Sequence, residues 1–463
     1  MNKKELIDKL SKFSNGGNAL LVFEKLLEKG TSEIKISQEE LALELNKTRP
    51  AIQKCLNTLN KLKVLEFGYG TIKISPDFIE SSIGNFLDYE PEGIKYMGSK
   101  SKILKKIFQE VQKLDIPNKP TILDGFAGST RVGQFFRKNG FIVTSNDLNI
   151  WSKTFGECYI SSGSEIDKEK LLKKIKELNN LKGIDGWYSK NYGGVVSGKN
   201  SAVQSDGKKR IWQKHNTKKL DAIREKISYW KKNGEITSQE ESILITSLIN
   251  ALDKVESTLG HYVSYLKEWS PRSYKTMNLV LPKLIDGPKG KSIQSDIFEA
   301  IKSYHDVMYF DPPYGSSNDK MPSSRVRYGQ YYHIWKTIIL NDKPELIGEI
   351  NKREDASVEG TYSVFEEYKK DEKEVFIAFN AIKRLIQEAN CKYIVFSYNN
   401  NSRVPVPDIL DWVKKQGYDF EVSFFEHAKN VMAHCSSTME WTELAGKKND
   451  EMLLVIKKGS SSN

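Results

Sequence analysis

The run Val307-Met308-Tyr309-Phe310-Asp311-Pro312-Pro313-Tyr314-Gly315 joins a hydrophobic segment to a rigid loop. A short apolar run that stops at Asp-Pro-Pro predicts a buried strand that ends abruptly. Each proline fixes its own φ angle and pushes the preceding residue toward extended geometry, so the loop cannot continue as a helix. Open α/β sheets bind their ligands at the carboxyl ends of their strands, which is where this loop would lie.

The loop also presents groups that can act on an amine. The exocyclic amine of adenine is a poor nucleophile, because its lone pair is delocalised into the ring. The Asp311 carboxylate and the Pro312 carbonyl could accept hydrogen bonds from its two hydrogens and draw the nitrogen toward tetrahedral geometry. Tyr314 could stack on a base that has left the double helix, a contact worth about 1–3 kcal/mol per base. Asp-Pro-Pro also occurs in ordinary strand-ending turns, so these residues alone leave both interpretations open.

Composition limits the class of protein and its partners. The chain has 463 residues, enough for two or three domains, and its formal net charge of +11 favours an acidic partner such as nucleic acid. A basic solvated surface is the alternative. The four cysteines are far apart and the six histidines form no ligand motif, so we expect reduced thiols and no metal site. The sequence has no run of the roughly 20 apolar residues that a membrane helix needs and no signal-peptide core after Met1, which predicts a soluble, cytoplasmic protein.

Residues 1–80 carry the pattern of a winged helix-turn-helix. Ser37-Gln38-Glu39-Glu40 is a capping box that starts a helix, and Thr48 is placed to cap a second helix with Pro50 in its first turn. Residues 64–67 and 71–74 then predict a β-hairpin. In such a module the second helix enters the major groove. Its candidate DNA contacts are Arg49, Gln53, Lys54 and Asn57. A module that serves dimerisation or protein contact is the alternative, and residues 81–92 are predicted to form a linker.

Residues 93–150 predict the binding site of a nucleoside-bearing cofactor. Residues 121–133 predict a strand, then a turn of small residues, then a helix that continues through Phe136, and small residues let a ligand approach the backbone. The next strand, at 141–144, is followed by Asp147. An acidic residue at the end of the second strand can bind a pair of ribose hydroxyls. An ordinary α/β turn is the alternative.

Residues 151–292 interrupt the alternation of strands and helices. Basic residues interleaved with aromatic ones follow a loop at 193–198, a composition that suits phosphate contacts and equally a solvated charged face. Thr237-Ser238-Gln239-Glu240 is a second capping box. The candidate DNA contacts of this region are Lys208, Lys209, Arg210, Lys214, Tyr265, Lys267 and Arg272.

The remaining sequence predicts further strands. Asp296 is placed to accept a hydrogen bond from a cofactor base, with a helix N-cap as the alternative. Residues 393–396 form an expected buried strand, and residues 420–425 and 452–456 look like the closing strands. The charge-rich segment 343–373 is expected to be an exposed excursion.

Taken in order, these motifs resemble those of the Dam-like, alpha-group adenine DNA methyltransferases, from about Gly93 to Lys457. The residues that carry the resemblance are Lys95-Tyr96-Met97-Gly98-Ser99-Lys100, Asp124-Gly125-Phe126-Ala127-Gly128, Asp147, Asp296, Asp311-Pro312-Pro313-Tyr314 and Phe396-Ser397. The resemblance implies a Rossmann-like methyltransferase sheet with helices on both faces, built from residues 93–150 and 293–458, with a target-recognition region inserted at 151–292. Two features depart from the family pattern: Thr130 stands where many relatives have a glycine, and the N-terminal block is not part of the minimal pattern.

The resemblance also implies roles for individual residues. Asp311, Pro312, Pro313 and Tyr314 would hold the flipped target base. The residues around the cofactor, S-adenosyl-L-methionine, would be Tyr96, Lys100, Asp124, Phe126, Ala127, Gly128, Asp147, Asp296, Ile297 and Phe298. Of these, Lys100 and the turn 126–128 would hold the methionine end, Asp147 the ribose, and Asp296 with its two neighbours the adenine.

The expected activity is site-specific transfer of a methyl group from S-adenosyl-L-methionine to the N6 amine of adenine in double-stranded DNA. The transfer would be direct and would follow base flipping, in a restriction–modification setting with a cognate restriction endonuclease as partner. Cytosine N4 methylation commonly uses Ser-Pro-Pro-Tyr, and RNA or protein amide methylation usually uses Asn-Pro-Pro-Tyr, so both fit the loop less well. A DNA-binding regulator with a degenerate methylase fold is the alternative from a different class.

Overall fold

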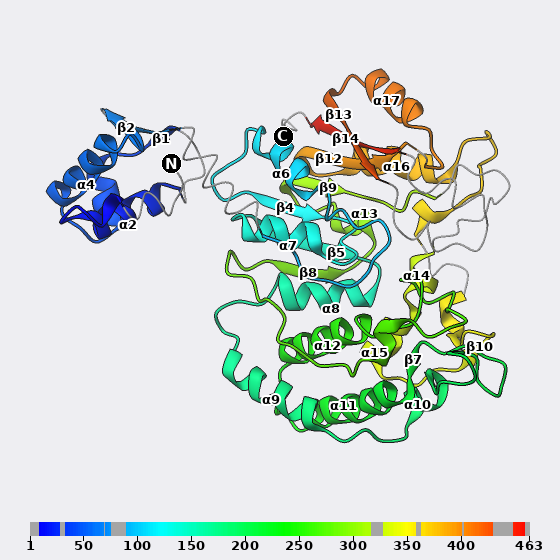
Figure 1. Cartoon of the computed structure of the whole chain (residues 1–463). Helices are drawn as coiled ribbons and strands as arrows, with labels where there is room; N and C mark the ends of the chain where they lie inside the picture. The colour runs from blue at the N-terminus through cyan, green and yellow to red at the C-terminus, as the bar shows by residue number, and fades with distance from the viewer. Residues whose placement is uncertain are drawn as a thin grey trace. The chain divides into compact units, whose positions relative to one another are not determined.

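The chain forms two compact units, Met1–Glu90 and Pro91–Asn463. The structure is a computed structural model that describes residues 9–27, 33–68, 70–75, 89–315, 327–357, 363–400, 402–428 and 448–458 (Figure 1). Most of the linker predicted for 81–92 lies outside the described residues, and so does Cys435. The other three cysteines, Cys55, Cys158 and Cys391, are buried free thiols.

In its described residues, the N-terminal unit combines the helices α2 (Gly16–Leu27), α3 (Gln38–Glu44) and α4 (Arg49–Lys61) with a small antiparallel sheet around its own hydrophobic core. The strands of this sheet are β1 (Glu33–Lys35), β2 (Leu65–Gly68) and β3 (Thr71–Ile74), in the order β1-β3-β2. The predicted hairpin is therefore confirmed, and β1 is an additional strand that the sequence did not predict. The apolar stripe of α4, which includes Ile52, Leu56 and Leu59, packs into the core.

Two helix starts in this unit were predicted, and they differ. The Ser37 capping box is confirmed: the Glu40 N–H donates to Ser37 Oγ at 3.1 Å, and the Ser37 N–H donates to Glu40 Oε2 at 2.8 Å. Thr48 occupies the N-cap of α4, but its side chain makes no capping hydrogen bond within the described part of the chain. Thr48 thus holds the predicted N-cap position without a side-chain cap, and Pro50, the second residue of α4, lies in the first turn as predicted, where its missing N–H needs no partner.

The larger unit is organised around a seven-stranded, mostly parallel sheet. Its strands are β4 (Thr121–Asp124), β5 (Ile142–Asp147), β8 (Lys291–Gln294), β9 (His305–Phe310), β12 (Cys391–Asn399), β13 (Asp419–Ala428) and β14 (Lys448–Lys457). They lie in the order β13-β14-β12-β9-β4-β5-β8, in which only β14 runs antiparallel to its neighbours. The strand predicted before Asp311 is confirmed as β9, in the middle of this sheet.

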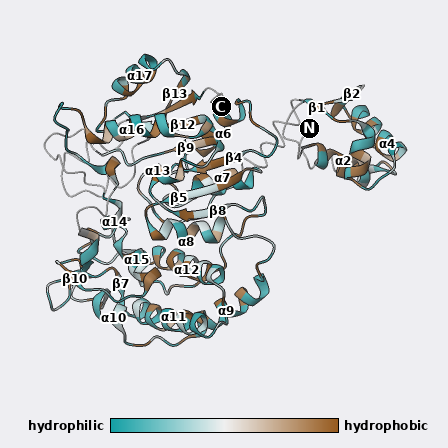
Figure 2. Ribbon diagram, turned by 180° about the vertical axis from the view of Figure 1, so that it is seen from behind, coloured by the Kyte–Doolittle hydropathy of each residue, from teal (hydrophilic) through white to brown (hydrophobic). Residues whose placement is uncertain are grey.

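Helices cover both faces of the sheet. Side chains alternate between the faces along each strand, and Leu123, Met308 and Phe310 pack with the helices of one face. Those helices are α13 (Ile297–Ala300), α16 (Ile377–Glu388) and α17 (Val406–Lys415). On the other face lie α6 (Leu104–Gln112), α7 (Arg131–Lys138) and α8 (Ile150–Tyr159). Hydrophobic residues accordingly colour much of the central strands in Figure 2.

A helical region adjoins the β8 edge of the sheet (Figure 1). It contains α9 (Lys168–Asn180), α10 (Trp187–Asn191), β6 (Gly193–Gly194), β7 (Trp212–Gln213), α11 (Lys214–Lys232), α12 (Ser238–Asp253), η1 (Pro271–Tyr274) and α15 (His333–Leu340). The predicted capping box at Thr237 is confirmed at the start of α12. The region differs in extent from the predicted insertion, because α8 packs on β5 and β8, β8 begins at Lys291, and α15 joins from later in the chain.

The expectation of an exposed excursion at 343–373 holds for most of the charged residues that the structure describes there, and it is wrong for Arg353 and Glu366, which are buried. The segment includes β10 (Leu346–Ile347), β11 (Lys352–Arg353), η2 (Glu354–Ser357) and η3 (Val364–Glu366). Arg353 is buried and pairs with Asp342 and Asp355, at 2.7 and 2.6 Å. The buried Arg353 is therefore an exception among the mostly exposed charged residues described in this segment. None of the helices in the described parts of the chain combines the length and hydrophobicity needed to cross a membrane.

Candidate active site

A pocket opens at the carboxyl ends of β4, β5 and β9. Five segments far apart in the sequence meet there, together with α14 (Tyr328–Tyr331) and η3. The predicted site residues that line it are Tyr96, Lys100, Asp124, Phe126, Ala127, Gly128, Asp147, Asp296, Ile297, Asp311 and Pro313. The remaining three lie beside it: Phe298 stacks on Phe365 at 6.1 Å between ring centroids, Pro312 is buried within the loop, and Tyr314 hydrogen-bonds to Asp311.

The turn after β4 is tightly packed around its glycines. A Cβ added at Gly128, where φ is +50°, would lie 2.6 Å from a ring carbon of Tyr96. The Gly128 N–H donates to Asp147 Oδ2 at 2.9 Å, which joins the turn to the end of β5. Asp124 is buried at the end of β4 and accepts the Gly133 N–H at 3.0 Å. Burial raises the pKa of Asp124 to about 7.

Thr130, the departure from the family's glycine pattern, keeps a glycine-like backbone. Its φ of +61° lies in the left-handed region, at the N-cap of α7. The residue is fully buried, and its hydroxyl accepts a hydrogen bond from Gln134 Nε2 at 3.2 Å. The left-handed turn is thus retained with a side chain in place of the glycine.

The pocket offers acceptors that fit a nucleoside. Asp147 Oδ1 accepts the backbone and side-chain N–H groups of Asn149, both at 2.9 Å, and the carboxylate also lines the pocket. Asn146 Oδ1 is buried and has no hydrogen-bond partner within the described part of the chain. Asp296 caps α13 by accepting the Phe298 N–H at 2.8 Å, so the N-cap alternative is confirmed, while the residue still lines the pocket. Acceptors beside the apolar side chain of Ile297 suit ribose hydroxyls and a purine base.

A buried ionic network holds the Asp311–Tyr314 loop. Lys100 Nζ lies 3.1 Å from Asp311 Oδ1 and 2.9 Å from Glu451 Oε1, and it also donates to the Tyr314 hydroxyl. The Tyr314 hydroxyl lies between the two carboxylates, 2.7 Å from Glu451 Oε1 and within hydrogen-bond distance of Asp311 Oδ1. Burial raises the pKa of Asp311 to about 6, although the Lys100 charge opposes this rise. The Lys100 ammonium group therefore has a role in this network, whether or not it also holds a cofactor.

Sequence reasoning missed Glu451, Phe365 and Glu366. Glu366 accepts the N–H groups of Tyr328 and Ser363, at 3.0 and 2.9 Å, and burial raises its pKa to about 7. The spacing of Ser363 and Glu366 is that of a capping box and could have indicated an ordered turn. Glu451 had no comparable local signal, because a single acid next to an apolar strand is common.

Aromatic rings position the segment 96–100. Tyr96 stacks on Tyr332 and Tyr328, with centroids 4.6 and 5.4 Å apart. The Met97 N–H donates to the Tyr332 hydroxyl at 2.8 Å. Arg131, the first residue of α7, donates to Ser99 Oγ at 2.7 Å. The segment 96–100 is thus anchored both to α7 and to Tyr328 and Tyr332.

Several candidate DNA contacts have partners within the protein. Arg210 is buried and pairs with Asp206 at 2.6 Å, and buried Tyr265 donates to the Ile350 carbonyl at 2.7 Å. Lys208 donates to Asn351 Oδ1 at 2.9 Å, and Lys214 lies 3.6 Å from Asp185. Lys267 is exposed and Lys209 is partly exposed. For Arg210 and Tyr265 the structure gives an internal packing role, and a DNA contact by either side chain would require it to leave its partner.

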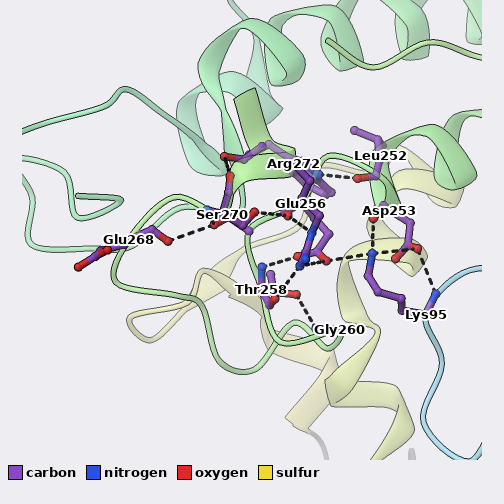
Figure 3. Close-up of polar contacts among 12 residues, drawn as sticks. Lys95, Leu252, Asp253, Glu256, Thr258, Gly260, Glu268, Ser270 and Arg272 are labelled. Carbon is purple, nitrogen blue, oxygen red and sulfur yellow. Dashed lines mark hydrogen bonds and ion pairs between the residues drawn. The ribbon is translucent and has the colours of Figure 1, made fainter. Parts of the chain in front are cut away.

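Arg272 belongs to an ionic cluster around a buried acid, Glu256 (Figure 3). Glu256 is fully buried, and its Oε1 forms ion pairs with Arg272 Nη2 at 2.6 Å and with Lys95 Nζ at 3.1 Å. Arg272 also donates to the carbonyls of Glu256 and Thr258, at 2.7 and 2.9 Å, and Lys95 pairs with Asp253 at 3.2 Å. The cluster closes the loop that follows α12 and joins it to the residue that precedes Tyr96. Arg272 therefore braces this loop, a role that sequence reasoning did not foresee.

In the N-terminal unit, the candidate residues lie on the side of α4 that faces away from the core. Arg49, Lys54 and Asn57 are exposed and Gln53 is partly exposed. Arg49 pairs with Glu39 at 2.8 Å, and Gln53 Nε2 donates to Asn57 Oδ1 at 3.4 Å. The arrangement leaves a polar helix face at the surface of this unit.

The mostly parallel seven-stranded sheet with its single antiparallel strand, and the pocket at the strand ends, fit a methyltransferase fold. The chain belongs to the D12 class N6 adenine-specific DNA methyltransferase family, whose profile matches residues 96–349, more than half of the chain. The resemblance drawn from the ordered motifs is thereby confirmed.

Curated relatives extend over most of the chain. Modification methylase StsI of Streptococcus sanguinis is 29% identical over 336 residues, which cover 70% of this chain and 47% of that protein. Modification methylase LlaI of Lactococcus lactis subsp. lactis is 25% identical, covering 80% of this chain and 56% of that protein. Type II methyltransferase M.NlaIII of Neisseria lactamica is 27% identical, covering 76% of this chain and 99% of that protein. The chain thus spans about half the length of the first two relatives and nearly all of the third.

Proposed function

We propose that this protein transfers a methyl group from S-adenosyl-L-methionine to the N6 amine of adenine in double-stranded DNA, at a specific sequence. The observation that carries this proposal is the Asp311–Tyr314 loop, which follows the central strand of the sheet and borders the pocket. Membership of an N6 adenine-specific family supports adenine over cytosine as the target base. The names of the relatives support a restriction–modification setting, in which methylation protects DNA from a cognate restriction endonuclease.

The cofactor would occupy the pocket, with its ribose near Asp147 and its adenine near Asp296 and Ile297. When bound, S-adenosyl-L-methionine supplies a methyl group on a positively charged sulfur, which leaves as a neutral thioether. Gly128 lets the Tyr96 ring pack against the turn after β4 in the pocket wall, and Asn146 Oδ1, which has no hydrogen-bond partner among the described residues, is an acceptor for a ligand N–H or O–H group. These features fit the group that the family requires.

The catalytic loop would hold the flipped adenine and activate its amine. The contacts of Asp311 to Lys100 and Tyr314 both fall on Oδ1, and no contact to Oδ2 is present among the described residues. Asp311 Oδ2 and the Pro312 carbonyl are then the two acceptors for the amine hydrogens, and the Asp311 carboxylate takes the proton that the nitrogen releases when it becomes methylated. Catalysis comes from positioning and from these prearranged acceptors. Stacking of the base on Tyr314 is part of this proposal.

The test is transfer of labelled methyl groups to mixed genomic DNA by the full chain and by Asp311→Ala. We expect the substitution to reduce transfer at least about 100-fold, the lower end of the range for loss of a general base. Asp306→Asn is the matched control, because Asp306 is an acid at the opposite end of β9 that holds Thr121. Equal activity of the wild type and Asp311→Ala would contradict the proposed role of the loop.

We also propose that the N-terminal unit is a winged helix that binds DNA through α4, and that the helical region beside β8 reads the target sequence. The order helix, helix, hairpin and the exposed polar face of α4 support the first assignment. The position of the helical region between segments of the catalytic unit supports the second. Lys209 and Lys267 remain its candidate DNA contacts.

A further inference from the structure

Glu451 is an acid that the proposed mechanism leaves without a role. It lies on β14, opposite Asn399 of β12, and only 2% of its surface is exposed. One of its oxygens, Oε1, lies 2.9 Å from Lys100 Nζ, 2.7 Å from the Tyr314 hydroxyl and 2.6 Å from Ser397 Oγ. A buried carboxylate costs free energy unless it is paired. These three contacts supply the pairing and join the last strand of the chain to the catalytic loop.

Lys100 is shared between two carboxylates. Its ammonium group lies 3.1 Å from Asp311 Oδ1 and at a similar distance from Glu451, and it is itself buried. A cation that paired with Asp311 alone would hold that carboxylate's charge more strongly and weaken it as a hydrogen-bond acceptor. Glu451 competes for the same cation, so Asp311 keeps more of its capacity to accept the amine.

We propose that Glu451 is a positioning residue for methyl transfer: it holds Lys100 and Tyr314 in place and divides the Lys100 charge, so that Asp311 remains an effective acceptor. The inference rests on the proposed function and adds a residue to it. Glu451 does not touch the amine in this arrangement and acts through its two neighbours. Ser397 fixes the carboxylate from β12 on the same sheet.

The charged and titratable groups that face Asp311 come from several elements. Besides Lys100, Tyr314 and Glu451, they are Asp124 of β4, Tyr309 of β9 and Tyr328 of α14. Of the two acids, Glu451 shares Lys100 with Asp311, whereas Asp124 is held by the Gly133 N–H. The pH dependence of Asp311 should therefore respond to Glu451 through both direct repulsion and the shared cation.

The test compares kcat and its pH dependence for the wild type, Glu451→Gln and Glu451→Asp. Glutamine keeps the size of the side chain and removes its charge. We expect kcat to fall about 10- to 100-fold, on the scale that misplacement of a reacting group by about 1 Å produces. The acid limb of the profile should move to lower pH, because the negative neighbour that disfavours ionisation of Asp311 is gone. Aspartate keeps the charge, so the acid limb should stay near its wild-type position.

Glu240→Gln serves as the control. Glu240, on α12, is also a buried acid paired with a lysine (Lys170 of α9), and it lies far along the chain from the loop. It should leave both kcat and the acid limb unchanged. If Glu451→Gln keeps kcat within twofold and the same acid limb per folded molecule, the inference is overturned.

A second measurement keeps the inference testable should the wild type prove inactive on adenine, which would instead contradict the proposed function. The Asp311 carboxyl can be titrated by NMR in protein labelled with ¹³C-aspartate, and its signal assigned with Asp311→Asn. In Glu451→Gln the midpoint of that titration should shift to lower pH. An unchanged midpoint would show that Glu451 does not act on Asp311.

Discussion

Asp311 lies between a positive and a negative side chain, and their balance determines the pH at which it can work. Its pKa is raised to about 6, chiefly by burial; the Lys100 charge acts to lower this pKa, and the Glu451 charge acts to raise it. The proposed acceptor must be ionised, so activity should rise as pH increases through this pKa. We expect kcat/KM for DNA to show an acid limb near pH 6, since this parameter reports groups of the free enzyme. Constant activity between pH 5 and 8, measured at fixed ionic strength, would contradict this assignment.

Gly128 should affect cofactor binding more than folding. Gly128→Ala places a methyl group against the Tyr96 ring at a positive φ. We expect the KM for S-adenosyl-L-methionine to rise about 10-fold or more, equivalent to about 1.4 kcal/mol, because Tyr96 must move from the pocket wall. Gly140→Ala is the matched control: φ there is +89°, but no atom lies within 4 Å of the added carbon. It should cost only the backbone strain and leave this KM unchanged. Equal KM values for the two variants would contradict the role of the close contact.

Buried acids should also make folding depend on pH. The pKa values of Asp124 and Glu366 are both raised to about 7 by burial. Between the unfolded values near 4 and these folded values, the folded chain binds more protons than the unfolded chain. Their contribution to stability is therefore complete below about pH 4 and is lost as pH rises through about 7. Between pH 5 and 8, the melting temperature of Asp124→Asn should fall less with rising pH than that of the wild type. An identical slope of melting temperature against pH would contradict the raised pKa of Asp124.

At the scale of elements, the Glu256 cluster joins a loop of the helical region to the segment that enters the pocket. Glu256→Gln removes the carboxylate that pairs with Lys95 and Arg272. Removing one partner of a buried ion pair costs about 3–5 kcal/mol, and we expect the lower end because both cations are partly exposed. Urea unfolding measures this loss. Glu299→Gln is the control, because Glu299 pairs with Lys302 on the surface and should matter by less than about 1 kcal/mol. Similar values for both variants would contradict a structural role of the cluster.

The elements were predictable where local pattern determines them. The strand before Asp311, the hairpin at Leu65–Ile74 and the helix starts at Ser37 and Thr237 follow from apolar runs and side-chain caps, and the structure confirms them. The burial of Arg353 and Phe365 was not predictable in this way, because Arg353 pairs with Asp342 and Asp355 and a capping turn carries Phe365 into the core. Such pairing depends on contacts that composition does not reveal.

At the scale of the whole molecule, the +11 charge and the separate N-terminal unit suggest two places where DNA can bind. If α4 contacts phosphates, Lys54→Ala should raise the KM for DNA with little change in kcat. Each lost phosphate contact should reduce the slope of log affinity against log salt by about 1. Lys35→Ala is the control, since Lys35 is exposed on β1 of the same unit. An unchanged KM and salt slope in Lys54→Ala would assign α4 to another role.

The order of motifs along the chain predicted the sheet and most of the pocket, because parallel strands bring their carboxyl ends to one edge. It could not predict Glu451, which reaches the site only because β14 inserts antiparallel beside β12. It also could not separate DNA contacts from internal ones. Arginines such as Arg210 and Arg272 are typical of a phosphate-binding surface, but in this structure they pair with Asp206 and Glu256.

The most direct test of the proposed function is the identity of the methylated nucleoside. Genomic DNA would be incubated with the full chain and S-adenosyl-L-methionine, digested to nucleosides and analysed by mass spectrometry, and the same DNA would be sequenced for the modified base. We expect N6-methyladenine confined to one short sequence, and none with Asp311→Ala. Methyl groups on cytosine would contradict the assigned base, and DNA binding without any methylation would contradict the proposed activity.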